Sequence, residues 1–423
     1  MADSSIAGSE MRSLTETWWD IFSGKASHRH PLPLAAMSTA YIANLVVSEI
    51  KFELVDEKLD KEVQRNLIPQ LGAIIQSMLV GGYVVVKPYI TYGGKIYFDY
   101  ATSRTFIPLQ LDETGNFVEG AFRDICKYHG REYERREHHL WHDGIHEVEN
   151  HVYIRGTKCE VPLDTVPRWA RLEALGKIES DIPMIATIRT PYVNNLDLNS
   201  ELPISIYANS IGTLDSINYA HTAYKREMKK MEALIFAAED IVSNRSGKKQ
   251  IVDDLFYMCE SDGEDDLKKS IDAYAPTPRE EQYKNALNTE LRLYEMEIGV
   301  SCGTFTFDES KGLVTATQVL SEDKTTYNTV GQLQGQVRPA LAAIAQITAT
   351  LARYYGAEVA DGEPGIEFGD SVFEDTGTEF QRRMQLVDAG LLRGELLTAW
   401  YFGVPEEKAK AMMGDKAALF GGE

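Results

Sequence analysis

The sequence predicts an α+β fold, because the periodicity of its apolar residues changes twice along the chain. Apolar residues follow a helical spacing up to Gly82, and from Tyr83 to about residue 156 they alternate with polar residues as in strands. Long helical patterns return after residue 204. Strands gathered in one run, with helices before and after them, are typical of an α+β protein.

The composition permits a large globular protein and disfavours a tight grip on nucleic acid. The chain has 423 residues, 43% of them hydrophobic and 25% charged, which is enough for two or three domains. Its 43 basic and 64 acidic residues give a formal net charge of −21. Tight DNA binding needs a basic surface, so we expect no wrapping of DNA, although DNA can still slide past such a surface.

Cysteine usage and hydropathy point to a reduced chain outside membranes. The four cysteines, Cys126, Cys159, Cys259 and Cys302, lie far apart and form no CxxC pair. No run of 18 apolar residues occurs, and the N-terminus lacks the pattern of a secretory signal. We therefore expect neither a disulfide framework nor a membrane span.

Three helices are predicted before the strands. In "SLTETWWDIFSG", Ser13 and Glu16 have the spacing of a capping box, which would start the first helix at this point. The second helix covers "PLAAMSTAYIANLVVSEI", and "KFELV" after it predicts a short strand. The third covers "LIPQLGAIIQSMLVGG" and ends at Gly81-Gly82, a C-cap signal.

The region of period two predicts an antiparallel sheet built from hairpins. The turns "YGGK", "DETG" and "HDGI" separate its segments. The predicted strands lie in "YVVVKPYI", "KIYFDYA", "TFIPLQLDETGNFVEGAF", "CKYHGREYERREHHLW" and "EVENHVYIRG". Residues 158–203 are irregular and rich in turn residues.

Long helices dominate the rest of the chain. The pattern predicts one helix from Ile204 to about Ala238 and a second over 279–301, with strand-like and acidic stretches between them at 239–278. A third helix over 313–355 should be kinked at Pro339, because proline removes an i→i−4 hydrogen bond and clashes with the preceding turn. A short strand, "GIEFGD", and three helices complete the tail.

Two groups of residues invite a metal or catalytic interpretation, and the spacing argues against both. The stretch "HHLWHDGIHEVENH" lies on predicted strands and turns and has no HExxH helix, so a solvated sheet face is expected. The acidic runs Asp253-Asp254 and Asp262–Asp266 lack the ligand order of an EF-hand and predict acidic loops. Without a P-loop or a GxSxG motif, we expect no enzyme activity, no cofactor and no metal.

The arrangement of the long helices leaves two interpretations open. The helices over 204–238 and 279–301 flank a compact insertion, and both carry many charges. They can form a hairpin packed on the chain's own sheet. They can also pack side by side with other copies in a ring, with the insertion protruding.

Four segments in chain order carry a resemblance to a known family. They are "SMLVGGYVVVKPYI" with the strands after it, "RTPYVNNLDLNSELPISIYANSIGTLDSIN", "KGLVTATQVLSEDKTTYNTV" and "IEFGDSVFEDTGTEFQRRMQLVDAGLLRGELLTAWYFGVPEEKAKAMM". In this order they resemble the portal proteins of tailed bacteriophages, in the branch from phages of Gram-positive hosts. The resemblance covers most of the chain.

The resemblance implies a phage portal fold with an α/β wing, a two-helix stem, a small clip and a helical crown. The implied parts are the wing with N-terminal helices and antiparallel sheet (1–203), stem helix 1 (204–238), the clip (239–278), stem helix 2 (279–301), a tunnel loop (302–312), a long kinked helix with a wing strand (313–373) and a short crown (374–423).

The function implied by the resemblance is that of a channel. Such proteins form a ring, usually of twelve subunits, at one capsid vertex of the virion, through which double-stranded DNA is packaged and later ejected. The implied partners are terminase, a head–tail adaptor, and the major capsid and scaffolding proteins, with assembly in the host cytoplasm. The alternatives are an enzyme, or a structural or adaptor protein of a phage head without a DNA channel.

The tunnel loop is the candidate site that the resemblance places on this chain. Its residues are Gly303, Thr304, Phe305, Thr306, Phe307, Asp308, Glu309, Ser310, Lys311 and Gly312. We expect Asp308 and Glu309 to repel DNA, Lys311 to make brief phosphate contacts, and the two glycines to act as hinges. An ordinary disordered loop is the alternative.

Small uncharged residues after this loop suit packing against a neighbouring subunit, where an unpaired charge would be costly to bury. They are Thr315, Thr317, Gln318, Ser321, Thr325, Thr326 and Asn328.

Overall fold

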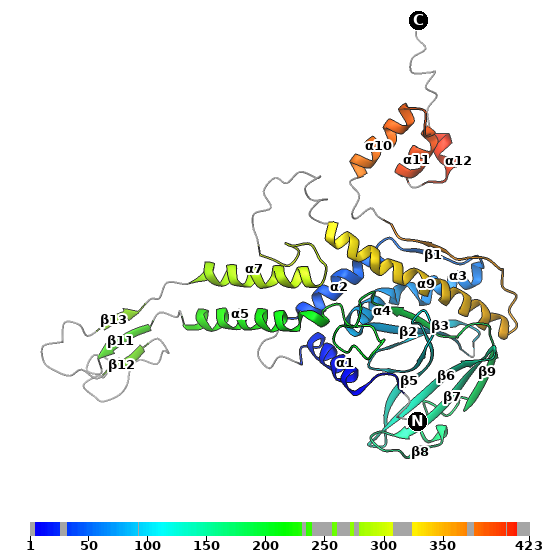
Figure 1. Cartoon of the computed structure of the whole chain (residues 1–423), viewed down its shortest axis with the longest axis horizontal. Helices are drawn as coiled ribbons and strands as arrows, with labels where there is room; N and C mark the ends of the chain where they lie inside the picture. Colours follow the sequence, from blue (N-terminus) through cyan, green and yellow to red (C-terminus); the bar gives the residue numbers. More distant parts are fainter. Residues whose placement is uncertain are drawn as a thin grey trace, which may run out of the picture.

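Helices and sheets form a mixed body from which a pair of helices projects (Figure 1). The computed structural model describes residues 5–25, 32–91, 93–230, 234–238, 256–259, 271–274, 279–307, 324–369, 376–402 and 404–412. The pair leads to a small three-stranded sheet, and a group of short C-terminal helices lies apart from the body (Figure 1). The predicted α+β class is confirmed.

The N-terminal region contains four helices: α1 (Ser9–Phe22), α2 (Leu34–Val47), α3 (Glu57–Asn66) and α4 (Ile68–Gly81). The predicted capping box was wrong, because α1 begins at Ser9 after Gly8 and Ser13 lies inside the helix. Sequence periodicity also missed α3. Its start has a clear local signal, since the Asp56 carboxylate accepts hydrogen bonds from the amides of Lys58 and Leu59.

A three-stranded antiparallel sheet forms the centre of the body. Its order is β10 (Ala186–Arg189), β2 (Tyr83–Ile90) and β3 (Ile96–Thr102). The first six residues of β2 are buried, which explains the continuous apolar run "YVVV" where a half-exposed strand would alternate. Helix α4 packs on this sheet, and so does α9 (Lys324–Tyr354).

A larger antiparallel sheet follows β3 in the chain. It is ordered β4 (Phe106–Leu111), β5 (Phe117–Tyr128), β6 (Arg131–His142), β7 (Ile145–Ile154) and β8 (Glu160–Val161), and β9 (Leu175–Glu179) also pairs with β7. The 3₁₀ turn η1 (Leu163–Thr165) lies between β8 and β9. The predicted hairpins are confirmed, although they divide between two sheets.

The histidines on this sheet are the main correction to the sequence analysis. His138, His139 and His146 are at most 8% exposed, so the solvated face predicted for the histidine stretch is wrong for these three. His139 shares hydrogen bonds with His146 (2.9 Å) and with the carboxylate of Glu137 (3.0 Å). Glu137 also pairs with Lys87 of β2, so buried polar contacts connect the two sheets. Polarity misled the prediction because His139 and His146 are buried together with their hydrogen-bond partners.

The predicted helix Ile204–Ala238 is shorter in the structure. After the 3₁₀ turn η2 (Ala208–Ser210), α5 covers Ile211–Lys230 and strand β11 covers Leu234–Ala238. Strand β11 pairs in parallel with β12 (Phe256–Cys259) and antiparallel with β13 (Ile271–Tyr274). Strand pairing with distant residues overrides the helical periodicity at the end of the predicted helix.

The second predicted stem helix is α7 (Glu280–Glu297), which ends before residue 301. Helix α9 continues through Pro339, and the bend expected there stays a prediction. The start predicted for this helix, residues 313–323, lies outside the described part of the chain. Strand β14 (Gly365–Glu367) pairs antiparallel with β1 (Lys51–Glu53), so a late segment of the chain is joined to an early one.

Three short helices end the described chain: α10 (Thr376–Asp388), α11 (Gly394–Phe402) and α12 (Glu406–Met412). Among the apolar side chains described there, only Leu397 and Ala409 are buried. No described helix is long and apolar enough to cross a membrane.

Candidate functional site

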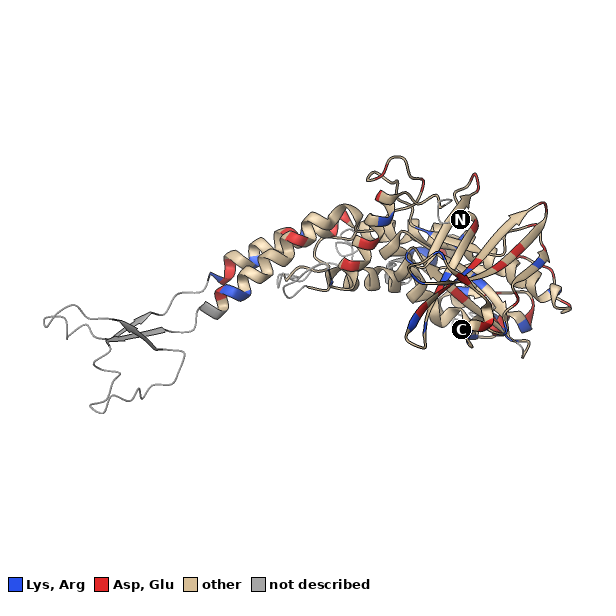
Figure 2. Cartoon of the chain, turned by 90° about the horizontal axis from the view of Figure 1, so that it is seen from below, with Lys and Arg blue, Asp and Glu red and all other residues tan. Residues whose placement is uncertain are grey.

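Helices α5 and α7 lie side by side and form the projection from the body (Figures 1 and 2). Leu214 and Ile217 of α5 and Leu291 and Tyr294 of α7 are buried at the end nearest the body. Acidic and basic residues are interspersed along the rest of the pair (Figure 2). The pair therefore has buried apolar contacts at its root and charged residues along its length.

The root is fixed to the body through α2. The hydroxyl of Tyr294 is fully buried and shares a hydrogen bond of 2.7 Å with the hydroxyl of Ser38. Burial raises the pKa of Tyr294 well above its ordinary value, so the phenol stays neutral. Thr213 of α5 donates to the carboxylate of Glu297 of α7 (3.0 Å), which joins the two helices at the same level.

Three side chains, here called the clasp (Glu227, Arg279 and Tyr283), connect the two helices at the outer end of the pair. Arg279 donates to both carboxylate oxygens of Glu227 at 2.8 and 2.6 Å, and the hydroxyl of Tyr283 donates to the same carboxylate. The hydrogen bonds from Arg279 lower the pKa of Glu227, and the hydrogen bond to Glu227 raises the pKa of Tyr283. The clasp lies where the chain leaves for strands β11–β13 and returns from them.

The predicted tunnel loop is described only in its first half. Gly303, Thr304, Phe305, Thr306 and Phe307 are placed, whereas Asp308, Glu309, Ser310, Lys311 and Gly312 lie outside the described residues.

The placed half of the loop is bound to α7. The amide of Gly303 donates to Glu295 at 2.7 Å, the amide of Phe305 donates to the same carboxylate, and the amide of Phe307 donates to Asn288 at 3.0 Å. The ring of Phe305 also meets the ring of Tyr41 edge to face.

The chain that returns from the loop is fixed to the start of the loop. The amide of Ser301 donates to the hydroxyl of Thr326 at 2.9 Å, and the amide of Thr326 donates to the hydroxyl of Ser301. The two hydroxyls lie 2.9 Å apart. The hydroxyl of Thr329 donates to the carbonyl oxygen of Gly299 at 2.7 Å. The segment before the loop (299–301) and the start of α9 after it (326–329) are therefore joined by hydrogen bonds.

This arrangement corrects part of the predicted subunit contact. Thr326 is 3% exposed and bonds within its own chain, so its assignment to a contact with a neighbouring subunit was wrong. Thr325 and Asn328 are exposed. The remaining members, Thr315 to Ser321, lie outside the described residues.

Sequence reasoning missed Glu295 and Asn288, although a signal was present. Both residues lie in the buried stripe of α7, with Leu291 and Ile298 at helical spacing. A buried carboxylate needs hydrogen-bond donors, so a glutamate within an apolar stripe indicates a local binding partner.

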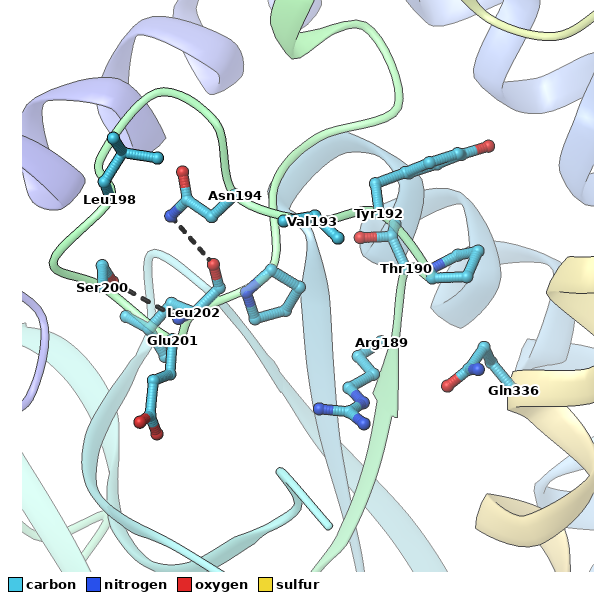
Figure 3. Close-up of a pocket in the computed structure, with 12 residues that line it drawn as sticks. Arg189, Thr190, Tyr192, Val193, Asn194, Leu198, Ser200, Glu201, Leu202 and Gln336 are labelled. Carbon is cyan, nitrogen blue, oxygen red and sulfur yellow. Dashed lines mark hydrogen bonds between the residues drawn. The ribbon is translucent and has the colours of Figure 1, made fainter. Parts of the chain in front are cut away.

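A cavity of about 470 Å³ lies between the segment 190–203 and Gln336 of α9 (Figure 3). Two hydrogen bonds join lining residues: Asn194 donates to the Leu202 carbonyl (3.0 Å), and the Leu202 amide donates to the Ser200 hydroxyl (3.3 Å). No His or Cys lines it.

Among the described residues, no group of three or more His, Cys, Asp or Glu side chains is placed to hold a metal ion. The most distinctive feature of the described chain is its architecture, a mixed body with a projecting pair of helices (Figure 1).

Comparison with known families decides which architecture this is. The profile of the family described as "Phage portal protein, SPP1 Gp6-like" matches residues 25–418. The chain belongs to the SPP1 Gp6-like phage portal protein family. This portal family is structural rather than enzymatic, and a portal protein is a component of the virion at the capsid vertex.

Other comparisons are more distant. No curated protein matches this portal protein. Among solved structures, one similar chain is titled "Neck of native GTA particle computed with C12 symmetry". It is 13% identical, with a TM-score of 0.44, over 92% of this chain and 93% of that chain. A likeness of this strength assigns neither fold detail nor function.

Proposed function

We propose that copies of this portal protein form a ring, of about twelve subunits in the related portals, around a channel for double-stranded DNA. The observation that carries the proposal is the α5–α7 pair, which projects from the mixed body to a small separate sheet (Figure 1). In this proposal the pair is the stem, the body is the wing, strands β11–β13 belong to the clip, and residues 374–423 form the crown. Including β11 moves the start of the clip from residue 239 to residue 234.

The segment Gly303–Gly312 is proposed to face the channel. The net charge of −21 on each subunit supports a conduit that repels phosphate and does not trap DNA. Asp308 and Glu309 would keep the backbone of DNA at a distance, and Lys311 would make brief contacts with phosphate.

The ring is proposed to serve as a docking platform as well. Terminase would bind during packaging and a head–tail adaptor afterwards, while the major capsid and scaffolding proteins surround the vertex. DNA would later be ejected through the same channel. The resemblance to portals from phages of Gram-positive hosts supports this set of partners, and assembly would take place in the host cytoplasm.

Imaging of the purified protein tests the ring. We expect negative-stain images to show a ring with a central hole and radial symmetry. A compact monomer would overturn the proposal. A ring without a hole would favour the alternative, a structural or adaptor protein of the phage head.

Variants of the loop test its role. Deletion of residues 304–310, or Lys311→Glu, should lower the yield of DNA-filled heads while rings still form, because the contacts between wall and DNA change. Heads that package and retain DNA as the parent does would contradict the assignment of this loop to the channel.

A further inference from the structure

The turn after α7 is held by a carboxylate that has no exposure to solvent. Glu295 is 0% exposed, and its Oε2 accepts from the Gly303 amide while its Oε1 accepts from the Phe305 amide. Within the described residues no ion pair to Glu295 is formed, so the two amides supply the hydrogen bonds that a buried charge requires.

A second acceptor on the same helix continues this pattern. Asn288, 5% exposed and seven residues before Glu295, accepts from the amide of Phe307. Positions seven apart lie on one face of a helix, two turns from each other. Three alternate amides, at Gly303, Phe305 and Phe307, are thus bound to one face of α7.

We propose that Glu295 is a positioning residue that fixes Gly303–Phe307 on the stem, so that these residues are part of the channel's rigid frame. This inference rests on the proposed channel function and narrows the loop named there. It also revises the role of Gly303 as a hinge. Gly303 has φ +99°, a conformation that favours glycine, and its amide is already bound to Glu295.

The chemistry of the acceptor makes the proposal specific to a carboxylate. The two amides use different oxygens, and glutamine has only one oxygen. In Glu295→Gln the side-chain NH₂ must therefore face one of the amide N–H groups. One hydrogen bond is lost and a donor meets a donor, although size and shape are nearly unchanged.

Hydrogen–deuterium exchange of the full chain, resolved to single amides over residues 301–307, tests the anchor directly. We expect the Gly303 and Phe305 amides to exchange about tenfold faster in Glu295→Gln than in the control Glu290→Gln, and tenfold corresponds to about 1.4 kcal/mol. Glu290 lies on the same helix, so the control changes the same charge by the same chemistry. Equal exchange rates in the two variants would overturn the proposal.

A second variant keeps the test sharp if Glu295→Gln folds poorly. Asn288→Ala removes the acceptor of the Phe307 amide and leaves Glu295 in place, so the Phe307 amide should exchange faster while Gly303 and Phe305 stay protected. An unchanged Phe307 amide would refute anchoring to α7.

Packaging assays separate the anchor from the function of the loop. If Glu295→Gln speeds exchange at Gly303 and Phe305, it should also lower the yield of DNA-filled heads toward the yield of the 304–310 deletion. The control Glu290→Gln should not lower this yield. If the deletion blocks packaging and Glu295→Gln packages like its control, the positioning role is wrong. If the deletion itself packages normally, the proposed loop function is wrong while the exchange result stands.

Discussion

At the scale of single residues, a buried polar chain links the central sheet to the larger sheet. The amide of Met184 donates to Nδ1 of His146, so the proton of neutral His146 lies on Nε2 and points to Nδ1 of His139. His139 then donates from Nε2 to Glu137, which also binds Lys87. Every group is satisfied with both imidazoles neutral, and an added proton would bring two N–H groups together. Burial and this geometry lower the pKa of His139, and lower that of His146 to about 3.

These shifts predict that the protein loses stability in mild acid. The unfolded histidines take up protons near pH 6.5 and the folded ones do not, so the stabilisation is complete above pH 6.5 and is lost as the pH falls below it. At pH 5 the loss from His146 should be about 2 kcal/mol. Urea unfolding between pH 7.5 and pH 5 measures it.

A pair of substitutions checks the source of this pH dependence. In His146→Gln, unfolding should take up about one proton fewer in this pH range, so the free energy of unfolding should depend less steeply on pH. The control is His142→Gln, because the side chain of His142 is half exposed and lies outside this chain of hydrogen bonds. Equal slopes in the two variants would contradict the assignment.

At the scale of elements, one glycine sets the junction between α4 and β2. Gly82 has φ +86°, and a Cβ atom there would lie 2.3 Å from the carbonyl oxygen of Pro203. The same contact brings the segment before α5 onto α4, where the Ile206 amide donates to the Leu79 carbonyl (3.0 Å). The segment before α5 and the end of α4 thus meet at a position that admits no side chain.

Gly82→Ala should therefore destabilise the protein by about 3 kcal/mol or more, from backbone strain and a clash with backbone that cannot move aside. Gly94→Ala is the matched control. Gly94 has φ +72° but no atom within 4 Å of an added Cβ, so it should cost only the strain, about 1 kcal/mol. Thermal and urea unfolding measure both, and equal costs would show that the Pro203 contact is not limiting.

At the scale of the whole molecule, charge and shape agree with a conduit. The chain carries −21, its helix pair bears both signs of charge, and only Leu397 and Ala409 are buried among the apolar side chains described in α10–α12. We expect helices with so little core of their own to gain stability when they pack against other chains.

The net charge predicts weak affinity of assembled rings for DNA. At 150 mM salt we expect a Kd no tighter than about 10⁻⁴ to 10⁻⁶ M, the range of non-specific binding. Asp308→Lys with Glu309→Lys should tighten binding and steepen its dependence on salt, since each new phosphate contact releases counterions. Fluorescence anisotropy with linear duplex DNA measures both. Nanomolar binding by the parent ring would contradict a sliding surface.

The sequence by itself determined the class of fold and most local elements. Strand β2 was predicted at its observed bounds, and the glycine turns placed the hairpins of the larger sheet, because period and turn chemistry are local properties. The resemblance in four segments identified the portal family, as the profile over residues 25–418 shows.

Only the tertiary structure decided which polar residues are buried and what holds the candidate site. Lys87 and Glu137 are 50 residues apart, and nothing local shows that they meet between two sheets. Strand β11 was predicted as helix because the local pattern does not show its pairing partners, which lie farther along the chain. The role of Glu295 follows only from the structure, in which the amides of Gly303 and Phe305 donate to its carboxylate. Burial and pairing depend on contacts between distant residues, and periodicity carries no information about those.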